Sequence, residues 1–356
     1  MIEKKISDFL ISKEKTVVEA MGKIDQNAKG ILFVVDEKEG LIGCITDGDI
    51  RRWLIKTGNL SAMVENAMTS TPKYVDVEEK QYAYEQMYDM GITAIPVLDK
   101  RRSIVDIVFL SDIQNKETSR TQRSLKGIPV VIMAGGKGTR LYPYTKILPK
   151  PLIPIGDTPI VERIINKYLE YGIDKYYMTV NYKKGMIKSY FSDFSHAYTI
   201  DYVEETKPLG TGGSIKLIKD KLDVPIFVTN CDALILGDYS DIYDYHIQAG
   251  NVITIVSSVK NIIIPYGVLH SQENGELIDL EEKPHLSYLI NTGMYVINPE
   301  TIQEIPENEM FHMTQLVEKV KNKGGRIGVY PISEDSFLDM GEFDGLHHME
   351  EKLNLR

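Results

Sequence analysis

The chain has 356 residues, of which 43% are hydrophobic and 26% are charged, so we expect a globular protein of two domains. Its 41 basic and 51 acidic residues give a formal net charge of −10, which argues against nucleic-acid binding, because phosphate neutralisation needs clustered Lys and Arg. No apolar run approaches the roughly 18 residues of a membrane span, and the N-terminus lacks an apolar secretory segment, so we expect a cytoplasmic protein without a membrane partner.

Residues 1–115 contain two copies of one unit, repeated with a period of about 60 residues. Each copy has a helix-like segment followed by two β-rich runs that a polar turn separates. These segments fall at 16–27 and 30–46 in the first copy, and at 78–90 and 92–110 in the second. In the first copy a capped helix follows the runs and ends at Gly58.

A polar segment at 116–127 is predicted to be a linker to a second domain at 128–356. In this domain, continuous apolar strands alternate with helical patterns, which is typical of a mostly parallel sheet covered on both faces. We therefore predict an α/β fold of the Rossmann-like kind. The strands are expected at 128–133, 176–181, 225–230 and 252–259, and the helices at 158–172, 184–191 and 242–250, with a short helix in the tail, 341–356.

The N-terminal repeat resembles a tandem pair of CBS domains, an α+β module, on the residues GCITDGDIRR (43–52) and MTSTP (68–72). The resemblance implies that Thr46 and Asp49 hold the ribose of an adenine or guanine nucleotide. The second copy departs from the pattern, because Phe109 stands where the Thr should be, before Ser111 and Asp112. CBS pairs commonly associate, so a homo-oligomer is expected. The alternative is a packing or dimerisation unit that binds nothing.

A glycine-rich segment, AGGKGTRL (134–141), directly follows a predicted strand. Such a turn lets backbone N–H groups approach phosphates closely. The segment is not a Walker A loop, because no Gly-Lys-Ser/Thr lies at the required spacing, and it is not a dinucleotide fingerprint, because Leu141 occupies the third glycine position. We call this segment the glycine loop.

The glycine loop resembles the G-G-x-G-T-R-L motif of the sugar-1-phosphate nucleotidyltransferase family. Six further motifs match that family in order along the chain, which a chance match to one glycine loop would not produce. They are PKPL (149–152), KPLGTGG (207–213), NCD (230–232), EKP (282–284), NTG (291–293) and DMG (339–341). The resemblance implies transfer of a nucleotidyl group from a nucleoside triphosphate to a sugar 1-phosphate, with release of pyrophosphate.

The same resemblance assigns roles to individual residues, and each role suits two anionic reactants that must be positioned and neutralised. Arg140 offers a planar fork for the departing pyrophosphate, Lys150 lies near the α-phosphate, and Lys283 holds the sugar phosphate. The nucleotide is expected to contact Ala134, Gly135, Gly136, Gly138, Thr139, Pro208 and Gly210.

Asp232 follows a predicted strand, at the end where open α/β sheets bind ligands. By the resemblance, Asp232 and Asp339 converge on one Mg²⁺, a cation that prefers oxygen ligands and substrate phosphates. Considered alone, Asp232 would be interpreted as a helix cap and Lys150 as a solvated side chain. Asp339 alone would indicate no special role.

Single residues indicate which base and which sugar the protein binds. Glu205 stands where the family reads the base, and an acceptor-only carboxylate suits the two adjacent donors of guanine, so GTP is favoured. Glu204 competes for this role, and a solvated loop charge is the alternative for Glu205. Asn291, Gly267 and Glu282 are expected at the sugar. The two-module layout resembles bacterial guanylyltransferases that make GDP-glucosamine for legionaminic acid synthesis, so glucosamine 1-phosphate is favoured.

Two other functions stay open. One is a uridylyl- or cytidylyltransferase that acts on another hexose 1-phosphate. The other is a non-catalytic nucleotide-sensing protein, although a degenerate site would be expected to lose Arg140, Asp232 or Lys283, and all three are present.

Overall fold

The computed structural model describes residues 5–27, 29–110, 124–192 and 197–353. The chain forms two compact units. The first unit comprises Met1–Arg120, Val259–Leu289 and Ser333–Asp335, and the second comprises Thr121–Ser258, Ile290–Ile332 and Ser336–Arg356. Most of the predicted linker, and Ser111 and Asp112 of the second repeat, lie outside the described residues.

The first repeat folds as a three-stranded sheet with helices packed against it. Strand β2 pairs in parallel with β1 and antiparallel with β3, and Gly58 ends α2 in the left-handed conformation, with φ of 66°. The predicted helix stop is therefore confirmed. The elements are a 3₁₀ helix η1 (Ile6–Phe9), β1 (Leu10–Ser12), α1 (Val17–Asn27), β2 (Ile31–Val35), β3 (Leu41–Thr46), α2 (Asp47–Thr57) and α3 (Val64–Ala67).

The second repeat has the same strand order and directions, with β5 parallel to β4 and antiparallel to β6. Its elements are β4 (Val75–Asp76), the 3₁₀ helix η2 (Val77–Tyr82), α4 (Ala83–Met90), β5 (Ala94–Leu98) and β6 (Ile104–Phe109). Phe109, at the place expected for a Thr, is 3% exposed, and its ring centroid lies 5.0 Å from that of Phe9. This side chain therefore packs in a core that both repeats share.

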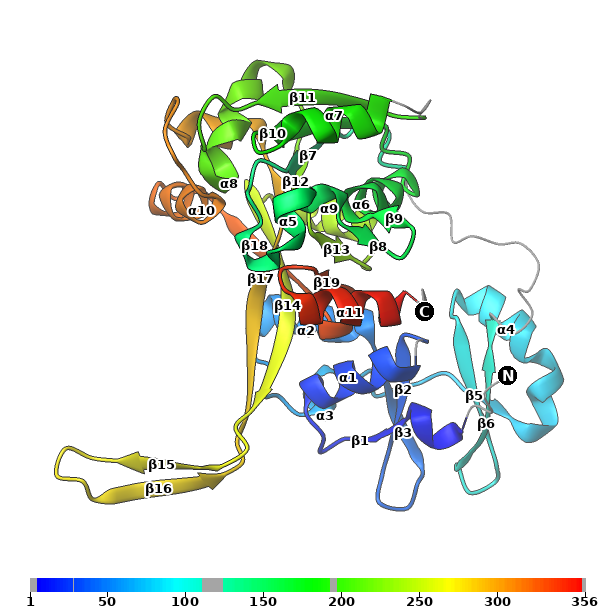
Figure 1. Ribbon diagram of the computed structural model, residues 1–356. Helices are drawn as coiled ribbons and strands as arrows, with labels where there is room; N and C mark the ends of the chain where they lie inside the picture. Colours follow the sequence, from blue (N-terminus) through cyan, green and yellow to red (C-terminus); the bar gives the residue numbers. More distant parts are fainter. Residues whose placement is uncertain (1–4, 28, 111–123, 193–196, 354–356) are drawn as a thin grey trace. The chain divides into compact units, whose positions relative to one another are not determined.

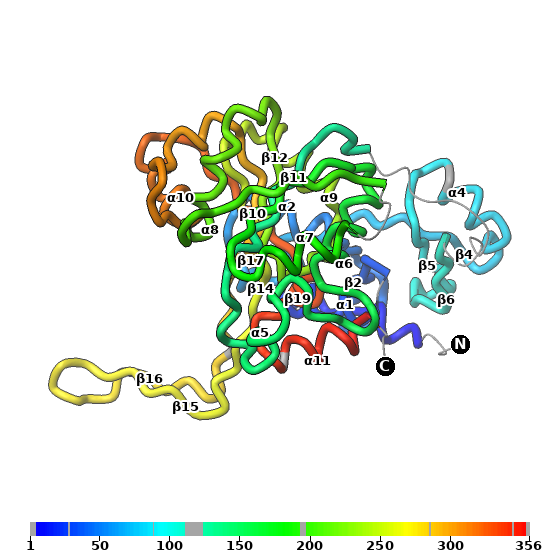
Figure 2. Tube along the Cα trace, turned by 45° about the horizontal axis from the view of Figure 1, so that its top comes forward, coloured from blue at the N-terminus to red at the C-terminus, as the bar shows by residue number. Residues whose placement is uncertain are grey.

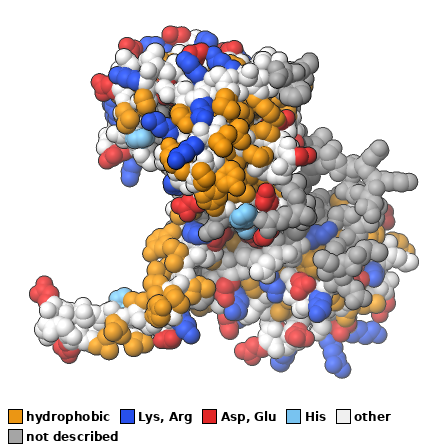
Figure 3. All heavy atoms as spheres, in the orientation of Figure 1, with side chains coloured by type: hydrophobic (Ala, Val, Ile, Leu, Met, Phe, Trp, Pro, Cys, Tyr) orange, Lys and Arg blue, Asp and Glu red, His pale blue; other side chains and the backbone are white. Residues whose placement is uncertain are grey.

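A β-hairpin completes the first unit and was not among the predicted elements. It is formed by β15 (Gly267–Ser271) and β16 (Leu277–Glu282), which are antiparallel. Hydrophobic side chains are exposed along it (Figure 3), among them Tyr266, Leu269, Leu277, Ile278 and Leu280. The sequence prediction assigns this segment to the domain 128–356. It groups with the N-terminal module because Val259 and Leu289 pack against the core of the first repeat.

The sheet of the second unit has seven strands in the order β11-β10-β7-β12-β17-β14-β18 (Figure 1), of which β14 and β17 continue into the segment Val259–Leu289 of the first unit. The pairs β11–β10, β10–β7, β7–β12 and β14–β18 are parallel, and β12–β17 is antiparallel. The predicted mostly parallel sheet is therefore confirmed. The strands are β7 (Val130–Met133), β10 (Lys175–Val180), β11 (Thr199–Glu204), β12 (Ile226–Asn230), β14 (Ile253–Ile263), β17 (His285–Ile297) and β18 (Ile327–Ile332).

Each face of this sheet is covered by helices, because alternate residues of its strands enter different cores. In β7, Val130 and Ile132 belong to one core, and Val131 and Met133 to the other. The first core contains α6 (Ile160–Leu169), α7 (Lys184–Ser192) and α9 (Tyr239–Gln248). The second contains the 3₁₀ helices η6 (Ser214–Lys221) and η7 (Pro299–Glu304) and the helix α10 (Met313–Asn322).

Short elements connect these layers and form much of the candidate site. The single-turn helix α8 (Gly210–Gly213) lies beside α10 (Figure 1 and Figure 2). None of the helices in the described ranges could cross a membrane. The remaining elements are η4 (Thr139–Leu141), α5 (Tyr144–Ile147), η5 (Lys150–Leu152), β8 (Pro154–Ile155), β9 (Thr158–Pro159), β13 (Ala233–Ile235), η8 (Glu334–Ser336), β19 (Phe337–Asp339) and α11 (Phe343–Lys352).

Candidate active site

A pocket of about 230 Å³ opens in the second unit at the carboxyl ends of two neighbouring strands. Met133 ends β7, Asn230 ends β12, and these two residues are paired in the sheet. This is where open α/β sheets bind ligands. The lining residues are Met133, Arg140, Thr211, Asn230, Asp232, Asn291, Thr292, Gly293, Tyr295, Met313, Phe337 and Asp339.

The structure brings Asp232 and Asp339 together in this pocket, although they are far apart in sequence. Strands β13 and β19 are antiparallel, with Ala233 opposite Asp339, and the Met340 N–H donates to the Asp232 carbonyl at 2.9 Å. Lost hydration and the negative charge of Asp232 both raise the pKa of the Asp339 carboxyl. Because β13 follows Asp232, this residue does not cap a helix.

Lys150 is a cation that lies beside this carboxylate pair, as Arg140 also does. Its ammonium is ion-paired with the Asp232 carboxylate, and the two side chains are 12% and 11% exposed. The interpretation of Lys150 as a solvated side chain is therefore wrong. Its position depends on Gly138, which has a φ of 64°, because a Cβ there would lie 3.0 Å from the Lys150 Cβ.

Hydrogen bonds hold the glycine loop at its first residue and in its middle. The Ala134 N–H donates to the Thr179 carbonyl at 3.0 Å, and the Thr145 hydroxyl donates to the Gly138 carbonyl at 2.8 Å. The Ala134 N–H is thus already engaged, whereas Gly136 and Thr139 are exposed. Arg140 follows in η4 and lines the pocket.

Glu205 is only 6% exposed and lies against the glycine loop, so it is not a solvated loop charge. A Cβ on Gly135 would lie 2.7 Å from the Glu205 Oε1. Burial raises the pKa of Glu205, and the hydrogen bond from the Leu209 N–H, at 3.2 Å, opposes the shift. The competing Glu204 is exposed, and hydrogen bonds from Lys184 and Lys188 of α7 lower its pKa to about 2.

Asn291, expected at the sugar, also lines the pocket. Its Nδ2 donates to the Tyr295 hydroxyl at 2.6 Å, and its Oδ1 accepts from the Gly293 N–H at 2.9 Å. Asn230 packs so closely on Gly293 that a Cβ there would lie 2.2 Å from the Asn230 Nδ2. Thr211, Tyr295 and Met313 were not predicted, and Thr211 alone had a signal, its place in the KPLGTGG motif.

Three predicted site residues, Gly267, Glu282 and Lys283, belong to the first unit. Gly267 and Glu282 are paired across the β15–β16 hairpin. Lys283 follows with a φ of 49°, a left-handed conformation uncommon for a residue with a side chain, and its N–H donates to the Tyr266 carbonyl at 3.3 Å. Their roles at the sugar phosphate stay predictions.

Thr46 and Asp49 are together at the start of α2, where they form a capping box. The Thr46 hydroxyl donates to the Asp49 Oδ2 at 2.6 Å and accepts from the Asp49 N–H at 3.1 Å. Arg52 donates to the other carboxylate oxygen at 2.6 Å. Both predicted ribose ligands therefore have a structural role without any nucleotide.

The pocket offers a metal ion two carboxylate ligands, Asp232 and Asp339. Within the described ranges, no group of three or more His, Cys, Asp or Glu side chains could hold a metal ion. Asp232 and Asp339 supply oxygen donors only, and they are held close enough for one to raise the pKa of the other. This donor set fits Mg²⁺, whose remaining ligands are commonly water and substrate phosphates.

Comparison with known families matches both parts of the chain. The family model described as Nucleotidyl transferase matches residues 129–355, and the model described as CBS domain matches residues 6–56, within the first repeat.

Curated relatives match about half of the chain. A mannose-1-phosphate guanyltransferase of Debaryomyces hansenii is 35% identical over 190 residues, covering 51% of this chain and 52% of the relative. A UTP--glucose-1-phosphate uridylyltransferase of Synechocystis sp. is 30% identical over 233 residues, covering 60% of each. The chain thus spans about half to three fifths of the length of these relatives.

A solved structure, HddC from Yersinia pseudotuberculosis, matches with a TM-score of 0.51 and 24% identity. The match covers 64% of this chain and 99% of HddC, which has also been crystallised in complex with GMP-PN. At this identity, the match shows a shared fold.

Proposed function

The chain belongs to the nucleotidyl transferase family, and on that premise we propose that it transfers a guanylyl group from GTP to a sugar 1-phosphate. The products are a GDP-sugar and pyrophosphate. One observation carries the proposal. Asp232 and Asp339 meet in a pocket that Arg140 also lines, with Lys150 ion-paired to Asp232.

Each of these residues has its own role in nucleotidyl transfer. A phosphate oxygen of the sugar 1-phosphate attacks the α-phosphorus of GTP, and the bond from that phosphorus to the pyrophosphate oxygen breaks. Arg140 receives the charge that builds on the pyrophosphate, and Lys150 neutralises the α-phosphate. Asp232 and Asp339 would hold Mg²⁺, which supplies positive charge at the phosphates when bound.

Glu205 is the proposed reader of guanine. Its Oε2 accepts from Leu209, and its Oε1 lies on the side of Gly135, at the glycine loop. An acceptor-only group suits the adjacent N–H donors of guanine. The guanyltransferase named among the curated relatives agrees with this choice.

A second candidate is uridylyl transfer. The uridylyltransferase relative matches 60% of this chain, a larger share than the 51% matched by the guanyltransferase relative. The same pocket would serve, because the charge to be neutralised is the same for either nucleotide.

Glucosamine 1-phosphate is the proposed acceptor. The support is the two-module layout, which resembles the guanylyltransferases of legionaminic acid synthesis, and Glu282, whose carboxylate can pair with an amino group. Asn291 and Gly267 would contact sugar hydroxyls, and Lys283 would hold the sugar phosphate.

The N-terminal module is proposed to bind an adenine or guanine nucleotide at Thr46 and Asp49. A ribose there would have to compete with the capping box that these side chains already form. Weak binding is therefore expected. Self-association of the module stays a prediction.

The deciding experiment measures pyrophosphate release with Mg²⁺ for GTP, UTP, CTP and ATP against glucosamine, mannose and glucose 1-phosphates. Fastest release with GTP and glucosamine 1-phosphate supports the proposal. Faster release with UTP selects the second candidate, and preference for another sugar removes the glucosamine assignment. No release with any pair leaves a nucleotide-sensing protein as the better interpretation.

A further inference from the structure

Residues 209–213, which we call the glycine turn, are bound to the start of α10. The Gly212 and Gly213 N–H groups both donate to the Phe311 carbonyl at 2.9 Å, and the Phe311 N–H donates to the Leu209 carbonyl at 2.9 Å. These two glycine amides are therefore engaged within the protein. Unlike those of an open phosphate-binding turn, they do not face a ligand.

The glycines of this turn are required by its contact with the segment before α10. A Cβ on Gly210 would lie 2.7 Å from the Phe311 carbonyl oxygen, and a Cβ on Gly212 would lie 3.1 Å from the His312 carbonyl carbon. A Cβ on Gly213 would lie 2.8 Å from the Glu309 carbonyl oxygen. Any side chain at these positions would push the two segments apart.

His312 adds a side-chain contact to this backbone contact. Its Nδ1 lies 3.4 Å from both the N and the Oγ1 of Thr211. Because the Thr211 N–H can only donate, Nδ1 acts as the acceptor and the ring carries its proton on Nε2. The Met313 N–H donates to the Thr211 Oγ1 at 3.1 Å, so the threonine hydroxyl is held from two sides.

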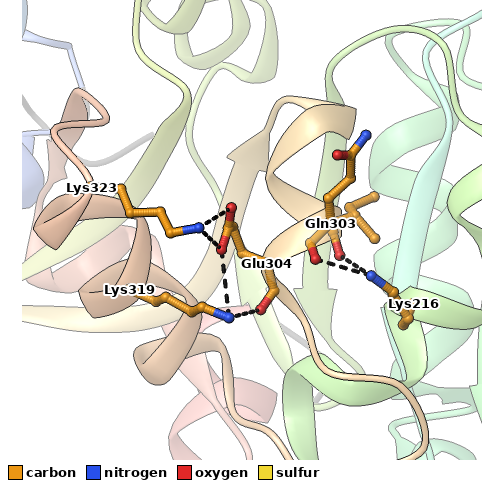
Figure 4. Close-up of polar contacts among 6 residues, drawn as sticks. Lys216, Gln303, Glu304, Lys319 and Lys323 are labelled. Atoms are coloured by element: carbon orange, nitrogen blue, oxygen red, sulfur yellow. Dashed lines mark hydrogen bonds and ion pairs between the residues drawn. The ribbon is translucent and has the colours of Figure 1, made fainter.

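The start of α10 is itself anchored. The Gln315 Oε1 accepts from the His312 N–H at 2.8 Å and so caps the helix. Farther along α10, Lys323 binds the Glu304 carboxylate at 2.7 and 2.8 Å, and Lys319 donates to the Glu304 carbonyl at 2.7 Å (Figure 4).

The 3₁₀ helix η6, which follows the glycine turn, is also bound to η7. Lys216 of η6 donates to the Gln303 carbonyl at 3.1 Å, as Figure 4 also shows. These contacts join α10 to η7 and η7 to η6. They hold the start of α10, and with it His312, beside the glycine turn.

Thr211 and Met313 line the pocket that contains Asp232. We propose that His312 is a positioning residue that holds Thr211, and with it the glycine turn, in the place where this wall of the pocket receives the nucleotide. The inference rests on the proposed function, which puts the nucleotide beside Pro208 and Gly210.

The test compares three variants in the full chain. His312→Ala removes the contact with Thr211 and also the acceptor that the His312 side chain gives to the backbone of Gln315 in the capping box of α10. His312→Asn keeps a side-chain acceptor in the place of Nδ1. Gln315→Ala is the matched control, because it weakens the cap of the same helix without touching the turn. Measurements are the KM for each substrate, kcat, and hydrogen exchange of fragments that contain residues 209–213.

We expect His312→Ala to raise the KM for the nucleotide about threefold to tenfold, the effect of losing one hydrogen bond. The KM for the sugar phosphate and kcat should change less than about twofold, and exchange in the turn should become faster. His312→Asn should restore both values, and Gln315→Ala should leave them as in the wild type.

A His312→Ala protein with wild-type nucleotide KM and wild-type exchange would overturn the inference. So would a Gln315→Ala protein that shows the same changes, because the role would then be general helix stability. If the wild type releases no pyrophosphate with any pair of substrates, the proposed function fails separately. Exchange in the turn then decides alone whether His312 positions it.

Discussion

The Lys150 ammonium is paired with the Asp232 carboxylate in the wall of the pocket, where both side chains are nearly buried. Asp339 lies next to this pair and adds a second negative charge. In the protein without substrate, the positive charges of Lys150 and Arg140 thus offset two neighbouring carboxylates, and both lower the pKa of Asp339. Removal of Lys150 should affect both stability and catalysis.

We expect Lys150→Met to lower the free energy of unfolding by about 3 kcal/mol, because it leaves a nearly buried carboxylate unpaired. It should also lower kcat by at least about 100-fold, the usual loss for one group that stabilises transition-state charge. Denaturant unfolding and pyrophosphate release measure the two effects. The control is Lys146→Met, an exposed lysine of α5, and a Lys150→Met protein as active as this control would contradict the proposed role.

Asp339→Asn should separate stability from function. The pKa of Asp339 is raised, so its charged form is disfavoured in the folded protein. Stability is therefore lost as the pH rises from the unfolded-state pKa through the folded-state pKa, and the loss is complete at neutral pH. At neutral pH without metal, the amide should therefore raise Tm. Added Mg²⁺ should raise the Tm of the wild type but not that of the variant, which should be inactive. Equal Mg²⁺ shifts in both proteins would remove Asp339 from the metal site.

The first two glycines of the glycine loop provide a matched pair. A Cβ on Gly135 would lie 2.7 Å from Glu205, whereas a Cβ on Gly136 would meet nothing within 4 Å. Gly135→Ala should lower stability by about 1–3 kcal/mol, the usual cost of overpacking, and weaken nucleotide binding by displacing Glu205. Gly136→Ala should keep wild-type stability, so that any loss of kcat/KM there reports contact with the triphosphate.

If Gly135→Ala were as stable as Gly136→Ala, Glu205 would move aside without cost, and its proposed role as base reader would lose its structural support. The direct check of that role is Glu205→Gln, which should lower the preference for GTP over UTP. The readout is the ratio of kcat/KM values for the two nucleotides.

The sequence predicted the second unit better than it predicted the first. Continuous apolar strands led to the parallel sheet and to a site at the carboxyl end of the strand before Asp232. The family resemblance of the ordered motifs led to Asp339 beside Asp232. The hairpin of β15 and β16 was missed, since its residues are exposed on both faces and lack the alternation of a half-buried strand.

Other features of the structure were not predicted because they depend on contacts between segments that are distant in sequence. The sequence around Phe109, which stands where the CBS pattern has a Thr, does not indicate that its ring packs against Phe9. Similarly, the contact of His312 with Thr211 spans about 100 residues, and a histidine before an amphipathic helix carries no signal of its own. Such contacts become visible only when the fold is known.

A buried histidine predicts how stability depends on pH. His246 of α9 is fully buried, with Nδ1 2.9 Å from the Thr254 hydroxyl and Nε2 2.9 Å from the Asn298 Oδ1. Because Asn298 Oδ1 can only accept, Nε2 carries the proton and Nδ1 accepts from Thr254. The neutral ring thus satisfies both neighbours.

Burial lowers the pKa of His246 in the folded protein. Between that pKa and the ordinary value of about 6.5, the unfolded chain binds more protons, so stability should fall as the pH drops below about 6.5. His246→Gln can keep one of the two contacts but does not titrate, so it should be less stable at neutral pH and should lose less stability on acidification. Urea unfolding from about pH 7.5 to about pH 5 measures both slopes. Parallel slopes for the two proteins would show that other groups cause the acid sensitivity.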